Sequence, residues 1–168
     1  MFKKHAWDIF SNSKARELVR RLTYLNKTVA AAESCSAGLA ADLIAQIPGA
    51  SKVFWGSFVS YTSEAKFRML GLEEDCLNLY GEVSRETACA MARGAMERSG
   101  ADFAFSITGL AGPGGDGTGK KAGTVWIATV QQGENPEATL FYFPGSRNKV
   151  RRKAAEKALE KILKKLPK

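Results

Sequence analysis

The segment Ala31-Ala32-Glu33-Ser34-Cys35-Ser36-Ala37-Gly38 joins two stretches of different character. Residues 28–32 before it are apolar and favour a β-strand, and residues 39–47 after it are rich in alanine and leucine at helical spacing. A strand that breaks into a helix through small residues exposes a side chain at the sheet end, beside the free N–H groups of the helix N-terminus. Ser34 is therefore a candidate nucleophile, as in the strand-to-helix turns of hydrolases. The simpler alternative is that Ser34 or Ser36 only caps the helix.

Strand-like and helix-like patterns alternate along the rest of the chain. We expect strands at 28–33, 53–61, 102–108, 124–131 and 138–143, and helices at about 6–25, 38–47, 63–70, 73–80, 84–99 and 148–166. This order predicts a three-layer α/β/α domain with a mixed sheet of about five strands, the last two forming a hairpin. A length of 168 residues fits one domain, 1–168.

The net charge of +8 is concentrated at one end of the chain. Residues 147–168 hold ten basic and two acidic side chains, so the preceding residues balance to zero. Apolar residues at helical spacing predict that this basic helix packs on the domain, with its lysines forming a solvated face. Binding to nucleic acid or to a membrane surface is the sharper alternative, and the lack of aromatic residues among the lysines disfavours nucleic acid.

The rarity of histidine restricts the chemistry that Ser34 can use. The single histidine is His5, near the N-terminus, which excludes a Ser-His-Asp arrangement and histidine-based metal sites. The three cysteines, at 35, 76 and 89, have no metal-type spacing and indicate reduced thiols in a cytoplasmic protein. Cys35 itself is a second candidate nucleophile, or simply a small buried residue. No apolar run approaches the roughly 20 residues of a membrane span, so we expect no membrane partner.

Lysine is the remaining candidate base. Lys66 follows Tyr61 by five residues where a predicted strand turns into a helix, although lysines at such positions are more often solvated. The glycine-rich loop 109–123 either presents backbone N–H groups to an anion or is only a flexible connection. Arg147, at the start of the last helix, is placed to meet a carboxylate or a phosphate.

Four segments together resemble the CinA C-terminal domain family: E-S-C-S-A-G at 33–38, Y-T-S-E-A-K at 61–66, T-G-L-A-G-P at 108–113 and G-T-V-W at 123–126. The resemblance covers about residues 14–165 in the family's order. It implies an amidohydrolase that converts nicotinamide mononucleotide to nicotinate mononucleotide and ammonia. It also implies a homo-oligomer that uses no metal and no cofactor.

The resemblance also assigns roles to particular residues. Ser34 would be the nucleophile, Lys66 would take its proton directly or through Tyr61, and helix N–H groups after Ser34 would stabilise the oxyanion. Further substrate contacts are expected from Glu33, Ser36, Ala37, Gly38, Thr108, Gly109, Gly112 and Arg147.

The sequence departs from the family pattern at three positions. Ala37 replaces a glycine, Ser63 an asparagine, and Ser146 an aspartate. Two alternatives stay open, the first suggested by Ala37 and Ser63 and the second by the basic C-terminal segment and the family's association with competence. One is an amidase acting on a different nucleotide-like amide, and the other is a non-catalytic nucleotide-binding or DNA-linked module.

Overall fold

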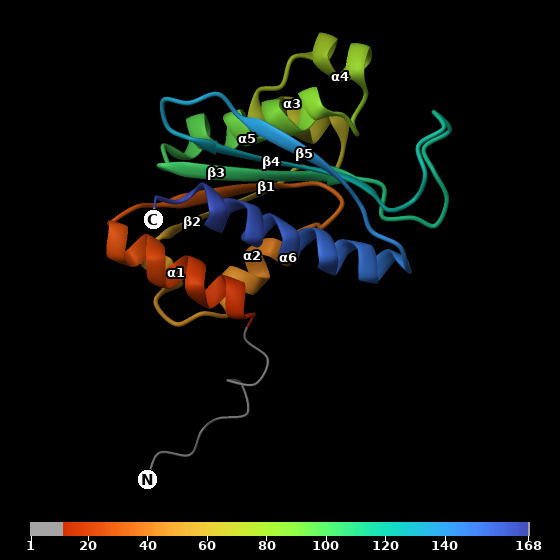
Figure 1. Cartoon of the computed structure of the whole chain (residues 1–168). Helices are drawn as coiled ribbons and strands as arrows, with labels where there is room; N and C mark the ends of the chain where they lie inside the picture. The colour runs from red at the N-terminus through yellow and green to blue at the C-terminus, as the bar shows by residue number, and fades with distance from the viewer. Residues whose placement is uncertain (1–11, 168) are drawn as a thin grey trace.

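The computed structural model describes residues 12–167, which form a five-stranded sheet between two layers of helices (Figure 1). The strands are β1 (Val29–Glu33), β2 (Phe54–Val59), β3 (Phe103–Gly109), β4 (Thr124–Gln131) and β5 (Glu137–Tyr142). The helices are α1 (Ser13–Leu25), α2 (Leu39–Ala45), α3 (Ser63–Leu70), α4 (Glu74–Tyr80), α5 (Arg85–Ser99) and α6 (Arg147–Lys165), with a 3₁₀ turn, η2 (Ala50–Lys52). In this part of the chain, none of the helices has the length and apolarity that a membrane span requires.

The sheet is mixed, as predicted. Its order is β2-β1-β3-β4-β5, with β1 parallel to β2 and β3, and β4 antiparallel to both β3 and β5. The carboxyl ends of β1, β2 and β3 therefore meet at one edge, where ligands commonly bind in open α/β sheets. The predicted hairpin is the β4–β5 pair.

The two faces of the sheet carry side chains of different size. Phe103, Phe105 and Ile107 of β3 pack with α1, α2 and α6, whereas Ala30 and Ala32 of β1 pack with α5 on the other face. Since side chains alternate along a strand, Ser34 continues the row of Ala30 and Ala32. The small residues let α5 lie close to the sheet, and they put Ser34 on the side of α3 and α5.

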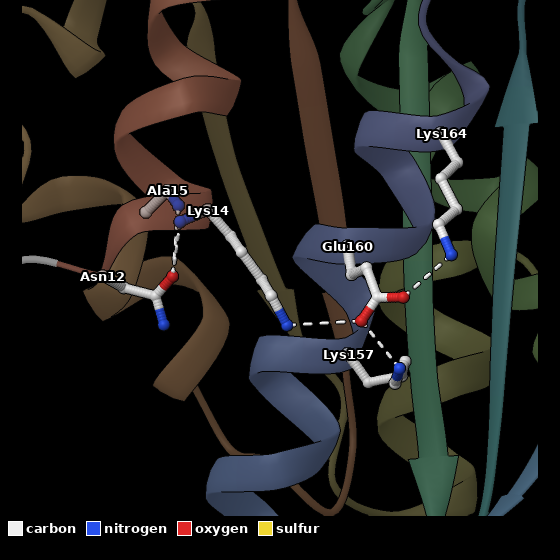
Figure 2. A network of polar contacts seen from close by, with 6 residues as sticks. All are labelled: Asn12, Lys14, Ala15, Lys157, Glu160 and Lys164. Carbon is white, nitrogen blue, oxygen red and sulfur yellow. Dashed lines mark hydrogen bonds and ion pairs between the residues drawn. The ribbon is translucent and has the colours of Figure 1, made fainter.

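A carboxylate ties α1 to α6 on the opposite side of the sheet (Figure 2). Glu160 of α6 contacts Lys14 of α1 at 3.3 Å and, on its own helix, Lys157 at 2.6 Å and Lys164 at 2.9 Å. Asn12 caps α1 by accepting hydrogen bonds from the first-turn amides. The earlier part of the predicted first helix, and His5, lie outside the described residues.

Two predicted boundaries differ from the structure around the turn at 34–38. The helix predicted at 38–47 is the shorter α2, preceded by Gly38 with φ +91°. The strand predicted to reach residue 61 ends at Val59, although Ser60 still donates its N–H to Glu33 O at 2.9 Å. Tyr61 therefore lies in the connection to α3, where it is free to face a neighbouring element.

Candidate active site

Ser34 and Lys66 come together at the carboxyl end of β1. Ser34 directly follows β1 and is 7% exposed, and the Lys66 side chain is fully buried. Thr62 caps α3 through the amide of Ala65, so Lys66 lies in the first turns of this helix and reaches toward β1. Lys66 Nζ lies 3.3 Å from Ser34 Oγ. Lys66 is thus not the solvated helix residue that its type alone would suggest.

Glu82 is a member of this site that the sequence analysis did not identify. Its carboxylate accepts hydrogen bonds from Lys66 Nζ at 2.7 Å and from Ser63 Oγ at 2.6 Å. Partial burial raises the pKa of Glu82, but the hydrogen bonds from Lys66 and Ser63 lower it more, so the pKa lies below its usual value. Glu82 follows Gly81 between two helices, a place where no local motif marks an acidic residue as functional.

The Glu33 side chain stabilises the turn after Ser34 through hydrogen bonds. Its side chain is fully buried and accepts hydrogen bonds from two hydroxyls and three backbone amides. The donors are Ser36 Oγ, Ser57 Oγ and the N–H groups of Gly38, Ala40 and Ala41. A carboxylate placed against the first turn of a helix satisfies its orphan donors and its dipole.

The contacts of Glu33 bear on two expectations about this turn. The side chains of Glu33 and Ser36 bond to each other at 2.8 Å and do not line the cavity beside Ser34, so they brace the turn. The helix N–H groups expected to stabilise an oxyanion are already occupied by the Glu33 carboxylate. Within residues 12–167, the amides of this turn that bond to no other residue are those of Cys35 and Ser36.

The environment of Cys35 favours Ser34 over its thiol as the nucleophile. Burial raises the pKa of its thiol to about 12, so the reactive thiolate is scarce at neutral pH. Arg151 of α6 also stabilises the turn, because its guanidinium donates hydrogen bonds to Cys35 O at 3.3 Å and to Ser36 O at 3.0 Å. Ser34 remains the nucleophile candidate, and the Cys35 N–H, next in the chain, is the donor best placed to serve it.

A cavity of about 500 Å³ opens beside Ser34. Its wall includes six of the residues expected at the site, together with Cys35, Glu82 and most of the loop 110–120. The six are Ser34, Tyr61, Thr108, Gly109, Gly112 and Arg147. Ala37 and Gly38 do not line it; Ala37 is exposed and adopts φ +51°. Among residues 12–167, no group of three or more His, Cys, Asp or Glu side chains is arranged to hold a metal ion.

Arg147 and Tyr61 form the outer part of the cavity wall. Arg147 donates to Tyr61 Oη at 2.5 Å and to Gly112 O at 2.8 Å. Tyr61 is 48% exposed, and in the described part of the chain its hydroxyl bonds to Arg147 and not to Lys66. This arrangement therefore favours direct proton transfer from Ser34 to Lys66, which are in contact, over transfer through Tyr61.

Comparisons with known proteins agree with this architecture. The sequence matches the CinA C-terminal domain family over residues 11–166. It is 42% identical to a CinA-like protein of Leptospira borgpetersenii over 83% of this chain and 33% of that protein. It is also 42% identical to a putative competence-damage inducible protein of Lacticaseibacillus casei, over 85% of this chain and 34% of that protein. The chain thus spans about a third of the length of the curated relatives it matches.

Solved structures show the same fold. A CinA superfamily protein from Escherichia coli superposes with a TM-score of 0.88 at 33% identity, covering 91% of this chain and 88% of the other. The competence/damage inducible protein CihA from Agrobacterium tumefaciens gives a TM-score of 0.84 at 39% identity, covering 91% and 96%. With the family match spanning nearly all of the described residues, the chain belongs to the CinA C-terminal domain family.

Proposed function

We propose that this chain hydrolyses the carboxamide of a nucleotide, with nicotinamide mononucleotide as the preferred candidate, through Ser34 as nucleophile and Lys66 as base. The observation that carries the proposal is the 3.3 Å contact between the buried Lys66 amine and Ser34 Oγ beside a cavity. Within residues 12–167, Lys66 is the one side chain hydrogen-bonded to Ser34. Serine–lysine pairs of this kind can replace the histidine of a catalytic triad.

The proposed reaction has two halves. Ser34 Oγ bonds to the amide carbon while its proton passes to the unprotonated amine of Lys66, and the carbonyl oxygen becomes an oxyanion near the Cys35 N–H. The carbon–nitrogen bond then breaks, the leaving nitrogen takes the proton from Lys66, and ammonia departs. Water attacks the resulting ester in the second half, with Lys66 again accepting a proton, and the carboxylate product and free Ser34 are released.

The cavity wall suits a nucleotide phosphate. Its volume falls within the range of small-molecule sites. Arg147 makes no ion pair with a carboxylate of the described residues, so its guanidinium can pair with a phosphate. Lys120 on the same wall adds a second cation, which is partly neutralised because its Nζ lies 3.8 Å from Asp116 Oδ2.

A DNA-linked role finds less support in the basic helix α6. Several of its basic side chains are engaged within the fold: Arg147 and Arg151 at the site, Lys157 and Lys164 with Glu160, and Lys165 with Glu134. The three lysines that pair with Glu160 and Glu134 are partly neutralised, which reduces the charge that this part of α6 can offer to a nucleic acid.

The test is ammonia release from nicotinamide mononucleotide by wild type, Ser34→Ala and Lys66→Met. We expect turnover in wild type and a loss of at least about 1,000-fold in each variant, as for other nucleophile and base removals. Ser51→Ala and Lys52→Met, both exposed in η2 and away from the cavity, are matched controls that should retain full turnover. Full activity of Ser34→Ala would overturn the proposal. Folded wild type without turnover would overturn the named substrate and favour another amide or a binding module.

A further inference from the structure

Glu82 makes contacts that the proposed chemistry does not by itself require. Its carboxylate is shared between Lys66 Nζ at 2.7 Å and Ser63 Oγ at 2.6 Å, both on α3. The contact from Lys66 to Glu82 is shorter than its 3.3 Å contact to Ser34. The hydrogen bond from Lys66 to the Glu82 carboxylate is therefore the stronger of the two, and the one to the proposed nucleophile is the weaker.

The backbone around Glu82 is held by hydroxyl groups on both sides. Gly81 O accepts from Ser84 Oγ at 3.1 Å and from Thr87 Oγ1 at 2.7 Å. Glu82 O accepts from Thr108 Oγ1 at 2.7 Å. This arrangement fixes the backbone of Glu82 relative to α5 and to the end of β3, and the hydrogen bonds from Lys66 and Ser63 then orient its carboxylate.

The two partners of the pair are unequally solvated. The Lys66 side chain is fully buried, whereas 44% of the Glu82 side chain is exposed. Burial alone favours an uncharged amine, and a carboxylate in contact favours an ammonium ion. A buried ammonium without a partner would be costly, and Glu82 is the partner that removes this cost.

An ammonium ion cannot accept the proton of a serine. We propose that Glu82 is a positioning residue that pairs with the Lys66 amine and thereby sets the lowest pH at which Ser34 becomes nucleophilic. This inference rests on the proposed Ser34–Lys66 chemistry, but not on the identity of the substrate.

The other ionisable groups around the pair do not replace Glu82. The turn after β1 contributes Cys35, whose thiol stays neutral because burial raises its pKa to about 12. The segment before α3 contributes the Tyr61 phenol, which bonds to Arg147 at the start of α6. Asp116, in the glycine-rich loop, pairs with Lys120. Among the described residues, Glu82 supplies the carboxylate hydrogen-bonded to Lys66.

The experiment measures Ser34 reactivity without any amide substrate. Phenylmethylsulfonyl fluoride sulfonylates the hydroxyl: a bond forms between Ser34 Oγ and sulfur, fluoride leaves, and the serine proton passes to Lys66. The rate is followed by intact mass from pH 5 to pH 10, and a peptide digest with a Ser34→Ala control assigns the site. We expect Glu82→Gln to lower the midpoint of the profile by about one unit or more, or about tenfold faster labelling below the wild-type midpoint.

The matched control removes the same charge from the same neighbourhood without touching the pair. Glu64 lies on the exposed face of α3 and pairs with Arg68 at 2.9 Å, so Glu64→Gln should keep the wild-type profile. Glu82→Asp keeps the charge and should restore most of the wild-type midpoint. Thermal unfolding confirms that each variant is folded, and Glu82→Ala carries the same expectation if Glu82→Gln does not fold.

An unchanged midpoint in folded Glu82→Gln would overturn the inference, as would an equal shift in Glu64→Gln. Wild type that is labelled at Ser34 with the expected profiles, but inactive on nicotinamide mononucleotide, would support the role of Glu82 and overturn only the proposed substrate. Wild type that is unlabelled at Ser34 across the whole pH range would overturn both.

Discussion

Replacing Glu33 by glutamine tests whether the turn that carries Ser34 is held by one buried carboxylate. Oε1 of Glu33 accepts from Ala41 N at 2.9 Å and Ser57 Oγ at 3.0 Å. Oε2 accepts from Ser36 Oγ at 2.8 Å, Gly38 N at 3.0 Å and Ala40 N at 3.1 Å. Glutamine keeps the shape of the side chain but turns one of the two acceptors into a donor.

The less costly orientation puts the new NH₂ group in place of Oε1. The hydroxyl of Ser57 can then turn and accept, but Ala41 N–H loses its acceptor, which costs about 1–3 kcal/mol. The three remaining hydrogen bonds change from charge-assisted to neutral and weaken by a further several tenths of a kcal/mol each. Relief from burying a charge offsets part of this, so we expect Glu33→Gln to lower the free energy of unfolding by about 2–4 kcal/mol.

Urea unfolding followed by circular dichroism measures this change, with the slope m unchanged. The control is Asp42→Asn, whose exposed carboxylate, within residues 12–167, accepts a hydrogen bond from the Gln46 side chain alone, at 2.7 Å. We expect that control to lie within about 0.5 kcal/mol of wild type. A loss below about 0.5 kcal/mol in Glu33→Gln would refute the view that this carboxylate holds the turn.

Three further changes follow from the same structure. Ala37→Gly removes a side chain from a position with φ +51° and should raise the free energy of unfolding by about 0.5 kcal/mol in urea; a loss would contradict this. Because burial raises the Cys35 pKa to about 12 from 9.0, iodoacetamide at pH 8 should label it about 1,000-fold more slowly in folded than in unfolded protein; equal rates would contradict this. Hydrogen bonds from Lys157 and Lys164 lower the pKa of Glu160 to about 2, so its contribution to stability is full above the unfolded value of 4.5 and is lost as pH falls toward 2. Glu160→Gln should therefore cost about 0.5–1 kcal/mol at pH 7 and progressively less in urea titrations below pH 4.5; a constant cost would contradict this.

The fold was largely predictable because its signals are local. β4 and α3 lie at their predicted bounds, 124–131 and 63–70. The end of β2 was not predicted correctly, because Ser60 and Tyr61 have strand-like character although the chain leaves the sheet after Val59 to enter α3. This boundary depends on the contact between Tyr61 and Arg147, two residues that are far apart in the sequence.

The site was predictable only in part. Ser34 and Lys66 were marked by their place at the ends of a strand and a helix and by the rarity of histidine. Glu33 was expected to contact substrate from the family resemblance, and its hydrogen bonds to three backbone amides at the start of α2 could not be read from the sequence. Glu82 had no signal, since its partner Lys66 is distant in the chain and on another element.

The most direct test of the central claim is the detection of an ester on Ser34. Wild-type protein mixed with nicotinamide mononucleotide and quenched in acid within the first turnover should gain the mass of the nucleotide minus ammonia. Peptide mapping should place this adduct on Ser34, and Ser34→Ala should show neither adduct nor ammonia release. Steady ammonia release by Ser34→Ala, or turnover in wild type with a persistent adduct on another residue, would contradict the account.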